Sequence, residues 1–285
     1  MQNSTIDVKP VTAAVGAEIH GIDLRQAMSE QTYREVRAAL NEHGVIFFRD
    51  QDITPAQQIA FASRFGAPHI DDLSVSARLK EHPEIVLIAK EPEQVRNIGG
   101  NWHTDHSFDK IPPLGAVLMA RELPDVGGDT MFASMYNAYD TLSDGLKKTL
   151  NGLRAIHRKT RAFDSRPLDR EIDPAERAKL RERFGGVEMS QPVTPYHPES
   201  GRRVLYVNPT YTVRFEGWTE QESEPLLQYL YKHAIRPENF CRFQWRQNSI
   251  AFWDNRSVWH YALNDYQGEK RLMHRVAVHG TGWGE

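Results

Sequence analysis

Residues 271–278 read Arg-Leu-Met-His-Arg-Val-Ala-Val. Successive side chains of an extended strand point to opposite faces, so this stretch puts Arg271, Met273, Arg275 and Ala277 on one face. Two guanidinium groups on an otherwise apolar face are costly to bury unless anions pair with them. The stretch therefore predicts a strand whose arginine face either lines a barrel interior that binds anionic ligands or faces solvent. The local pattern alone leaves both interpretations open.

Further runs of this kind make the chain rich in expected strands. Residues 13–22 are expected to be extended, with bends at Gly16 and Gly21, and Gly127-Gly128-Asp129 predicts a turn. Apolar or alternating runs predict strands at Val45–Phe48, Ile85–Ile88, Leu114–Met119, Thr130–Phe132, Cys241–Arg246, Ile250–Trp253 and Leu272–Val278. Many strands and few helices favour a mainly β fold with flanking helices, either a β-sandwich or a jelly roll.

Three helices are marked by their capping residues. Ser29 is expected to begin a helix that Gly44 ends. Capping boxes begin the other two helices, at Thr54 and at Thr219. Gly66 is expected to end the second of the three. We expect these helices to lie outside the β structure.

Length, charge and cysteine content narrow the class of protein. The chain has 285 residues, a size that a single all-β domain often reaches. Its formal net charge of −3 argues against nucleic acid or an anionic membrane surface as a partner. No apolar run approaches a membrane span, and residues 1–8 lack the pattern of a secretory signal. The single cysteine, Cys241, excludes an internal disulfide framework and a thiolate metal cage, so we expect a cytoplasmic protein.

Residues 157–188 break the succession of strands. They contain nine Lys or Arg and seven Asp or Glu, with few large apolar residues. A solvated surface excursion with one short helix, capped by Asp173 and Pro174, is the simpler interpretation. Long segments in compact domains are often functional, so a mobile lid or insertion at about residues 157–190 is the alternative.

Twelve histidines invite a search for metal ligands, because histidine is the commonest protein ligand of metals. Four of them are followed two residues later by a carboxylate: His69-Ile70-Asp71, His82-Pro83-Glu84, His103-Thr104-Asp105 and His197-Pro198-Glu199. Each pair can equally be a histidine with an unrelated acid nearby, and the two His-Pro-Glu pairs are expected in turns. His103 and Asp105 follow Trp102, an apolar anchor typical of a strand, so they are the first candidates.

Several short motifs occur together in one order. They are Gly16-Ala17-Glu18-Ile19, Phe48-Arg49-Asp50-Gln51, Arg64-Phe65-Gly66, Trp102-His103-Thr104-Asp105, Gly127-Gly128-Asp129-Thr130, Trp253-Asp254-Asn255-Arg256 and Arg271-Leu272-Met273-His274-Arg275. With the distant His260, this set resembles the iron(II)- and 2-oxoglutarate-dependent dioxygenases, in the branch of taurine dioxygenase and 2,4-dichlorophenoxyacetate dioxygenase. The resemblance spans residues 8–278, and several ordered motifs are specific where a lone His-x-Asp is not.

The resemblance implies a fold, cofactors and a set of site residues. The fold would be a double-stranded β-helix, a cupin-like jelly roll, in a single domain of residues 1–285. His103, Asp105 and His260 would hold iron(II), with 2-oxoglutarate and O2 at its open positions. Arg271 would pair with the distal carboxylate of 2-oxoglutarate, which matches a guanidinium fork, and Thr130 would hydrogen-bond it. Halogenating relatives carry a small residue in place of Asp105, so the resemblance implies a hydroxylase that releases succinate and CO2.

The resemblance also indicates a substrate class. Arg275 matches the residue that binds the substrate's sulfonate in the taurine branch, and Phe163 and Tyr211 keep aromatic character at matching positions. We therefore expect a small organic anion: a sulfonate, a sulfate ester or an aryloxyalkanoate. Asp71 and His106 depart from the taurine pattern, which has a second histidine and a small apolar residue there. Asp71 could point away from the anion or recognise a cationic group, and His106 could contact the anion instead.

Two other functions stay open. A hydroxylase for an amine-bearing amino-acid or natural-product substrate would use Asp71 to bind the amine. A protein that binds a metal or an anion without turnover would have no need for open metal positions. Relatives in this family are often dimers or tetramers, so we expect a homo-oligomer.

Overall fold

The computed structural model describes residues 4–70, 77–159 and 188–283, and also residues 175, 178, 179 and 182. The first part contains β1 (Asp7–Pro10), β2 (Ala17–His20), α1 (Glu30–His43), β3 (Val45–Phe48) and α2 (Pro55–Ser63). The middle contains β4 (Arg78–Leu79), β5 (His82–Lys90), β6 (Gly115–Glu122), β7 (Thr130–Ser134), α3 (Met135–Asp140), α4 (Asp144–Leu150) and β8 (Arg154–Arg158). The last part contains β9 (Glu188–Pro192), β10 (Thr212–Phe215), α7 (Glu220–Ala234), the 3-10 helix η1 (Pro237–Asn239), β11 (Phe240–Phe243), β12 (Ile250–Asp254), β13 (Val258–Ala262) and β14 (Arg271–Val278).

The strands form three sheets. The largest has eight strands in the order β1-β2-β3-β12-β6-β14-β5-β4, in which only β2 and β3 pair in parallel. The second sheet has the order β11-β7-β13 and the third the order β10-β8-β9. The expected fold, mainly β with few helices, is therefore confirmed. In the described ranges, no helix has both the length and the apolar character that crossing a membrane requires.

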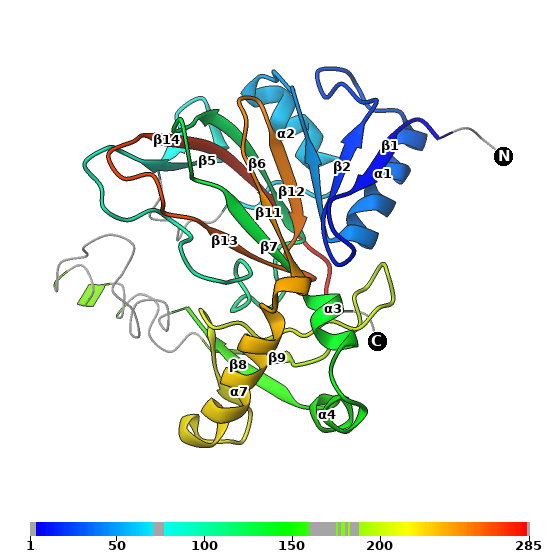
Figure 1. The fold of residues 1–285 in the computed structure, drawn as a ribbon, viewed down its shortest axis with the longest axis vertical. Helices are drawn as coiled ribbons and strands as arrows, with labels where there is room; N and C mark the ends of the chain where they lie inside the picture. Colours follow the sequence, from blue (N-terminus) through cyan, green and yellow to red (C-terminus); the bar gives the residue numbers. More distant parts are fainter. Residues whose placement is uncertain are drawn as a thin grey trace.

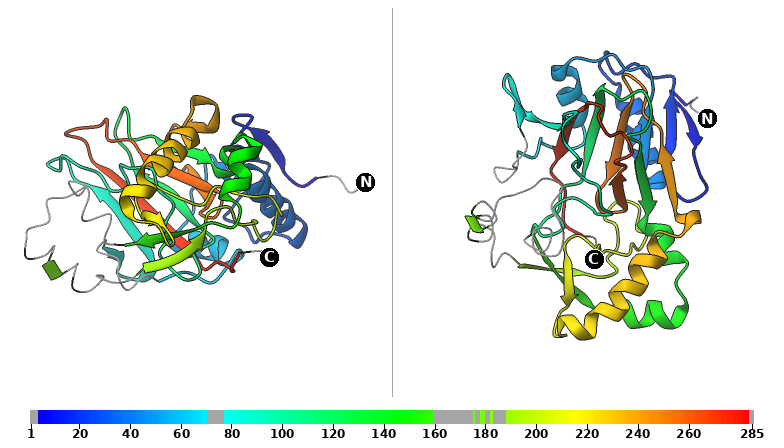
Figure 2. Two further views of the ribbon diagram at one scale, coloured as in Figure 1. Left: turned by 90° about the horizontal axis from the view of Figure 1, so that it is seen from below. Right: turned by 60° about the vertical axis from the view of Figure 1, so that its left-hand side comes forward.

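Apolar cores order these elements into layers. On one face of the eight-stranded sheet, α1 and α2 pack over the central strands (Figure 1). Leu40, Phe61 and Phe252 are among the side chains buried there. On the other face, the sheet packs against β11-β7-β13, where the rings of Phe47 and Phe243 stack at a centroid distance of 4.0 Å. The helices α3, α4 and α7 lie with the third sheet below the two larger sheets, as Figure 1 and the right-hand view of Figure 2 show.

The arginine face of β14 points into the space between the two larger sheets. Met273 and Ala277, on this face, lie in the core that joins the sheets, together with Phe132 of β7. Arg271 is only 4% exposed. The solvent-facing interpretation of this strand is therefore wrong, and the interior interpretation is confirmed.

The capping residues begin the helices where the sequence predicts. The Ser29 side chain caps α1, and Gly44 follows it with a φ of 73°. Both capping boxes are formed, at Thr54 and at Thr219.

Gly66, however, does not end α2. The helix ends at Ser63, and Arg64 occupies the cap position with a right-handed helical conformation. Gly66 is required by a close approach instead, because a Cβ there would lie 2.6 Å from the carbonyl oxygen of His279. The glycine thus serves packing between distant segments and not helix termination.

The first His-Pro-Glu pair lies in a strand and not in the expected turn. His82, Pro83 and Glu84 form the start of β5. Pro83 has no N–H to donate, but the pairing of β5 with β4 is irregular there and its pairing with β14 begins only at Val86. The strand therefore tolerates the proline at its end. The other pair, at residues 197–199, does lie at a turn.

The segment expected as a lid, residues 157–190, falls largely outside the described residues, and so does the helix cap expected at residues 173–174. Its two ends are described, because β8 ends at Arg158 and β9 begins at Glu188. These two residues are cross-strand partners and form an ion pair. The chain therefore leaves and rejoins the third sheet at neighbouring points.

Gly115 offers a test of the packing between β6 and β12. A Cβ at this position would lie 2.0 Å from the carbonyl oxygen of Trp253 in the paired strand. We expect Gly115→Ala to lower the free energy of unfolding by about 1–3 kcal/mol, because the strands must shift apart. Gly145→Ala is the control, since a Cβ there meets nothing within 4 Å and alanine favours helix α4. Denaturant titration followed by circular dichroism measures both, and equal stability of the two variants would refute the packing argument.

Candidate metal centre

His103, Asp105 and His260 come together from two distant parts of the chain. The first two lie in the loop between β5 and β6, and His260 lies in the middle of β13. The backbones of His103 and His260 pair through two hydrogen bonds of 3.1 and 2.8 Å. Their Nε2 atoms lie 3.6 and 3.8 Å from Oδ1 of Asp105, and one ligand atom from each residue lies within 4.8 Å of the others. We call this group the triad, and its spacing suits three ligands of one metal ion.

The orientation and burial of the triad favour metal binding. His103 Nδ1 lies 2.7 Å from the carbonyl oxygen of Asn101, which can only accept, so Nδ1 donates there and Nε2 is the ring nitrogen that faces Asp105. Burial, and after it the charge of His103, hold the pKa of His260 well below its ordinary value. Burial acts to raise the pKa of Asp105, but Arg275 and the two histidines outweigh it and hold that pKa well below its usual range. Two imidazoles and a carboxylate form the facial set typical of non-haem iron(II).

Arg275 lies next to the triad, on the interior face of β14. Its Nη2 donates a hydrogen bond of 2.6 Å to Oδ2 of Asp105, a charge-assisted contact. Asp105 therefore turns one oxygen toward the two histidines and the other toward the guanidinium. The expected partner of Arg275 is a substrate anion, whereas its partner in the structure is the triad carboxylate.

Arg271 lies four residues before Arg275 on the same face, about 13 Å along the strand. It is buried, yet its Nε and Nη2 have no hydrogen-bond partner among the described residues. Burial lowers the pKa of Arg271, and the carboxylate of nearby Asp129 is hydrogen-bonded to Arg242 at 2.6 Å. A buried guanidinium without its own anion is costly, so this geometry fits a site for an anionic ligand.

Thr130 and Gly128 lie near this guanidinium. A Cβ on Gly128 would lie 3.2 Å from Cδ of Arg271, so glycine leaves room for the arginine side chain. The Thr130 hydroxyl accepts a 3.0 Å hydrogen bond from the indole N–H of Trp245, whose ring centroid lies 5.8 Å from the Arg271 guanidinium carbon. Thr130 of β7 pairs with Ala262 of β13, which lies two residues after His260. The predicted 2-oxoglutarate residues and the triad thus lie between the same two sheets.

The turn between β12 and β13 holds the loop that carries the triad. The Thr104 hydroxyl donates a short hydrogen bond to the carbonyl oxygen of Asn255. The Asn255 side-chain oxygen accepts from the backbone N–H of Asp105 at 3.4 Å and from the indole N–H of Trp253 at 2.8 Å. Sequence reasoning assigns no role to Asn255, because its partner lies 150 residues away.

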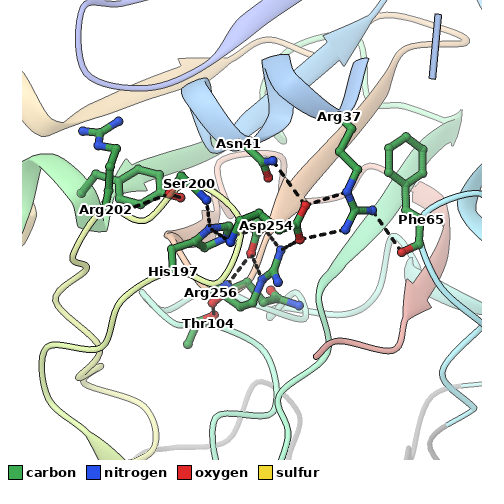
Figure 3. Close-up of polar contacts among 12 residues, drawn as sticks. Arg37, Asn41, Phe65, Thr104, His197, Ser200, Arg202, Asp254 and Arg256 are labelled. Carbon is green, nitrogen blue, oxygen red and sulfur yellow. Dashed lines mark hydrogen bonds and ion pairs between the residues drawn. The ribbon is translucent and has the colours of Figure 1, made fainter. Parts of the chain in front are cut away.

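Buried charges anchor this turn (Figure 3). Arg256 donates to the two carboxylate oxygens of Asp254 at 2.9 and 2.6 Å, and His197 Nε2 lies 3.0 Å from Oδ2. Glu199 accepts from Arg256 at 2.9 Å and from Arg37 of α1 at 2.7 and 2.8 Å. Burial acts to raise the pKa of Asp254, but Arg256 and then His197 hold it well below its usual range. Charged residues in the short turn between two mostly apolar strands are the sequence signal that indicates such a buried pair.

The structure describes two of the remaining predicted substrate residues, His106 and Tyr211. His106 has a φ of 52°, and its Nδ1 lies 3.1 Å from Oδ2 of Asp109. Phe108 packs against both predicted residues, at ring centroid distances of 5.1 Å from His106 and 5.0 Å from Tyr211. These rings therefore form one surface beside the loop of the triad. The other two predicted residues, Asp71 and Phe163, lie outside the described residues.

Asn255→Ala tests whether the turn positions the triad. We expect the variant to bind cobalt(II), a spectroscopic substitute for iron(II), about 10–100-fold more weakly, because the loop that carries Asp105 loses a supporting hydrogen bond. Asn264→Ala is the control, since its amide bonds to a backbone carbonyl at an exposed site. Titration of the metal-free protein, followed by visible absorption, measures the affinity. An unchanged affinity in a folded Asn255 variant would argue against the positioning role.

Comparisons with known proteins agree with this geometry. The model of the taurine catabolism dioxygenase TauD, TfdA family matches residues 7–277. An alkylsulfatase of Acinetobacter baylyi is 31% identical over 291 residues, which cover 98% of this chain and 87% of that protein. An alpha-ketoglutarate-dependent sulfate ester dioxygenase of Pseudomonas putida is 32% identical over 284 residues, which cover 96% of this chain and 90% of that protein.

Solved structures show the same relationship. A taurine dioxygenase from Burkholderia xenovorans matches with a TM-score of 0.79 and 34% identity, covering 99% of this chain and 92% of that one. AAD-2 in complex with Mn(II) and N-oxalylglycine matches with a TM-score of 0.80 and 30% identity, and the match covers 98% of this chain and 99% of that one. This chain belongs to the TauD, TfdA family of alpha-ketoglutarate-dependent dioxygenases, oxidoreductases that use iron(II), 2-oxoglutarate and O2.

Proposed function

We propose that this enzyme hydroxylates a small organic anion, namely a sulfonate, a sulfate ester or an aryloxyalkanoate, and releases succinate and CO2 from 2-oxoglutarate. The observation that carries the proposal is the buried guanidinium of Arg271, whose Nε and Nη2 lack partners among the described residues. It lies between the same two sheets as the triad. A dicarboxylate that reaches the metal with one end and Arg271 with the other would supply the missing anion.

In this proposal His103, Asp105 and His260 hold iron(II), which when bound supplies the chemistry that activates O2. Arg271 binds the distal carboxylate through its planar fork, and the Thr130 hydroxyl, which already accepts from an indole, donates its own proton to that carboxylate. Burial excludes water from this contact and strengthens it. The complex of the related AAD-2 with Mn(II) and N-oxalylglycine, a dicarboxylate, supports this assignment.

The proposed substrate class rests on Arg275 and on the relatives. The described hydrogen bond of Arg275 uses Nη2, which leaves Nε and Nη1 as donors for a substrate anion. The surface formed by His106, Phe108 and Tyr211 suits the organic part of such a molecule, and Asp71 and Phe163 are proposed to complete the pocket. Relatives are named for sulfate esters and for (S)-phenoxypropionate, which supports an anionic substrate.

We also propose the fold type, the oligomeric state and the cellular location of the enzyme. The eight-stranded sheet and the sheet β11-β7-β13 would form a double-stranded β-helix within one domain of residues 1–285. Their shared apolar core supports this arrangement. A lid at about residues 157–190 is proposed from the length and composition of that segment, and a cytoplasmic location from the single cysteine. A homo-oligomer, either a dimer or a tetramer, is proposed from the resemblance.

Turnover with a panel of compounds tests the proposal. The protein is supplied with iron(II), 2-oxoglutarate and O2 and is incubated with alkyl sulfates, alkyl sulfonates, aryloxyalkanoates and amine-bearing amino acids. We expect at least one anion to raise succinate formation above the substrate-free background, His103→Ala to abolish this increase and His82→Ala to keep it. Stimulation by the amines alone would favour recognition through Asp71. No stimulation by any compound would contradict the proposed function.

Arg271→Gln separates ligand binding from folding. We expect it to weaken 2-oxoglutarate binding about 100-fold or more, because losing one partner of a buried ion pair costs about 3–5 kcal/mol. The metal-free variant should unfold at no lower temperature than the wild type, since the described contacts include no partner for Nε or Nη2. Arg246→Gln, at an exposed arginine in the loop after β11, is the control. Calorimetric titration of the metal-loaded proteins measures their affinity for 2-oxoglutarate. Equal affinities of the two variants would show that Arg271 does not bind 2-oxoglutarate.

A further inference from the structure

A second group of side chains that can bind a metal joins the loop that follows the triad carboxylate to the segment that follows α2. His69, His106 and Asp109 each offer one ligand atom within 4.8 Å of the others. Within residues 4–70, 77–159 and 188–283, this group and the triad are the two sets of three such side chains that meet the distance. The sequence marks His69 and His106 as separate candidates but does not indicate that they meet, because a long stretch of chain separates them.

The distances within this group resemble those within the triad. Oδ2 of Asp109 lies 3.1 Å from His106 Nδ1 and 3.9 Å from His69 Nε2. In the triad the corresponding carboxylate-to-imidazole distances are 3.6 and 3.8 Å. Ligands at about 2.0–2.1 Å from a tetrahedral zinc ion lie about 3.4 Å apart, so small side-chain rotations would complete either site.

A plain hydrogen bond accounts for only part of this arrangement. His106 and Asp109 are three residues apart in one turn, where the Asp109 N–H donates to the His106 carbonyl at 2.9 Å, and a side-chain contact between them is unremarkable. His69 comes from a different segment and turns Nε2 toward the same carboxylate oxygen. Its distance of 3.9 Å is too long for a hydrogen bond and suits two ligands that share a cation.

Hydrogen bonds to the sheets hold the backbone of two of the three residues, His69 and Asp109. The N–H of His69 donates to the carbonyl of Ala277 in β14 at 2.8 Å. The Asp109 carbonyl accepts a 2.8 Å hydrogen bond from the Gln191 side chain. A group whose backbones are fixed by the sheets loses little conformational entropy when a metal binds.

The three side chains are partly exposed, which permits a bound ion to exchange with solvent. The side chains of His69 and His106 are each 16% exposed and that of Asp109 is 31% exposed, so a hydrated ion can reach them. Two imidazoles and one carboxylate suit a borderline transition metal such as zinc, and not the harder Mg²⁺ or Ca²⁺. Three protein ligands leave a position for water, which is typical of an exchangeable site and not of a closed structural one.

We propose that His69, His106 and Asp109 form a second site for a divalent transition metal of the zinc class. The inference does not rest on the proposed function, because the distances within the group carry it. His106 also belongs to the surface proposed for the substrate, so a bound ion would lie at the edge of that surface. Such an ion would hold the turn that follows Asp105.

Counting bound zinc tests the proposal. The full-length protein is freed of metal, dialysed against Zn²⁺ and analysed for zinc per chain. We expect about two equivalents for the wild type and about one for Asp109→Asn and for His106→Asn, in which asparagine tolerates the positive φ. His82→Ala, which changes a histidine outside both groups, should keep both equivalents. A single equivalent in the wild type, or the same loss in His82→Ala, would overturn the proposal.

Thermal unfolding gives an independent test of the second site in a variant whose triad lacks one ligand. In the His103→Ala background, Zn²⁺ should still raise the midpoint of unfolding, because a metal that binds only the native state stabilises it. Adding His69→Ala to that background should abolish the increase, and the two metal-free variants should unfold alike. An increase that persists in the double variant would place the zinc elsewhere. If the wild type binds the second zinc but shows no turnover with the panel of compounds, only the proposed function is contradicted.

Discussion

The ion pair between Asp254 and Arg256 is the contact on which the geometry of the site depends. Both residues are buried, at 0% and 1% exposure, in the turn where β12 ends and β13 begins. Removing one partner of such a pair costs about 3–5 kcal/mol, so the turn is held in the conformation that keeps both. His197 and Glu199 supply further hydrogen bonds and connect the turn to α1 (Figure 3). Asn255, between the two charges, then positions the loop of the triad.

Three interior arginines differ in what balances their charge. Arg256 has two carboxylates of its own protein within hydrogen-bond distance, so its role is structural. Arg275 shares the carboxylate of Asp105 with the triad. Arg271 is the most costly of the three, because two of its buried nitrogens have no partner in the described part of the chain. The balance of charge around these three arginines therefore separates residues that maintain the fold from a residue that fits a ligand.

Local signals predicted elements well where the deciding forces act over a few residues. The caps at Ser29, Thr54 and Thr219 satisfy backbone groups within one turn, so the sequence alone locates them. The interpretation of Gly66 as a cap was wrong because a distant backbone carbonyl, that of His279, requires the glycine. The expected turn at residues 82–84 was wrong because Pro83 lies where the sheet is irregular, and irregular pairing is a property of neighbouring strands.

The sequence by itself determined which chemistry was available: a His-x-Asp pair, a distant histidine, two arginines on one strand face, and a set of motifs that identifies the family. Only the tertiary structure decided that the arginine face is interior, that Arg275 contacts Asp105, and that Asn255 supports the triad loop. It also brought His69 to Asp109. The physical reason is that sheet pairing and the packing of one sheet on another join residues far apart in sequence. Such contacts leave no local pattern, because neither partner's neighbours along the chain reveal what it will meet.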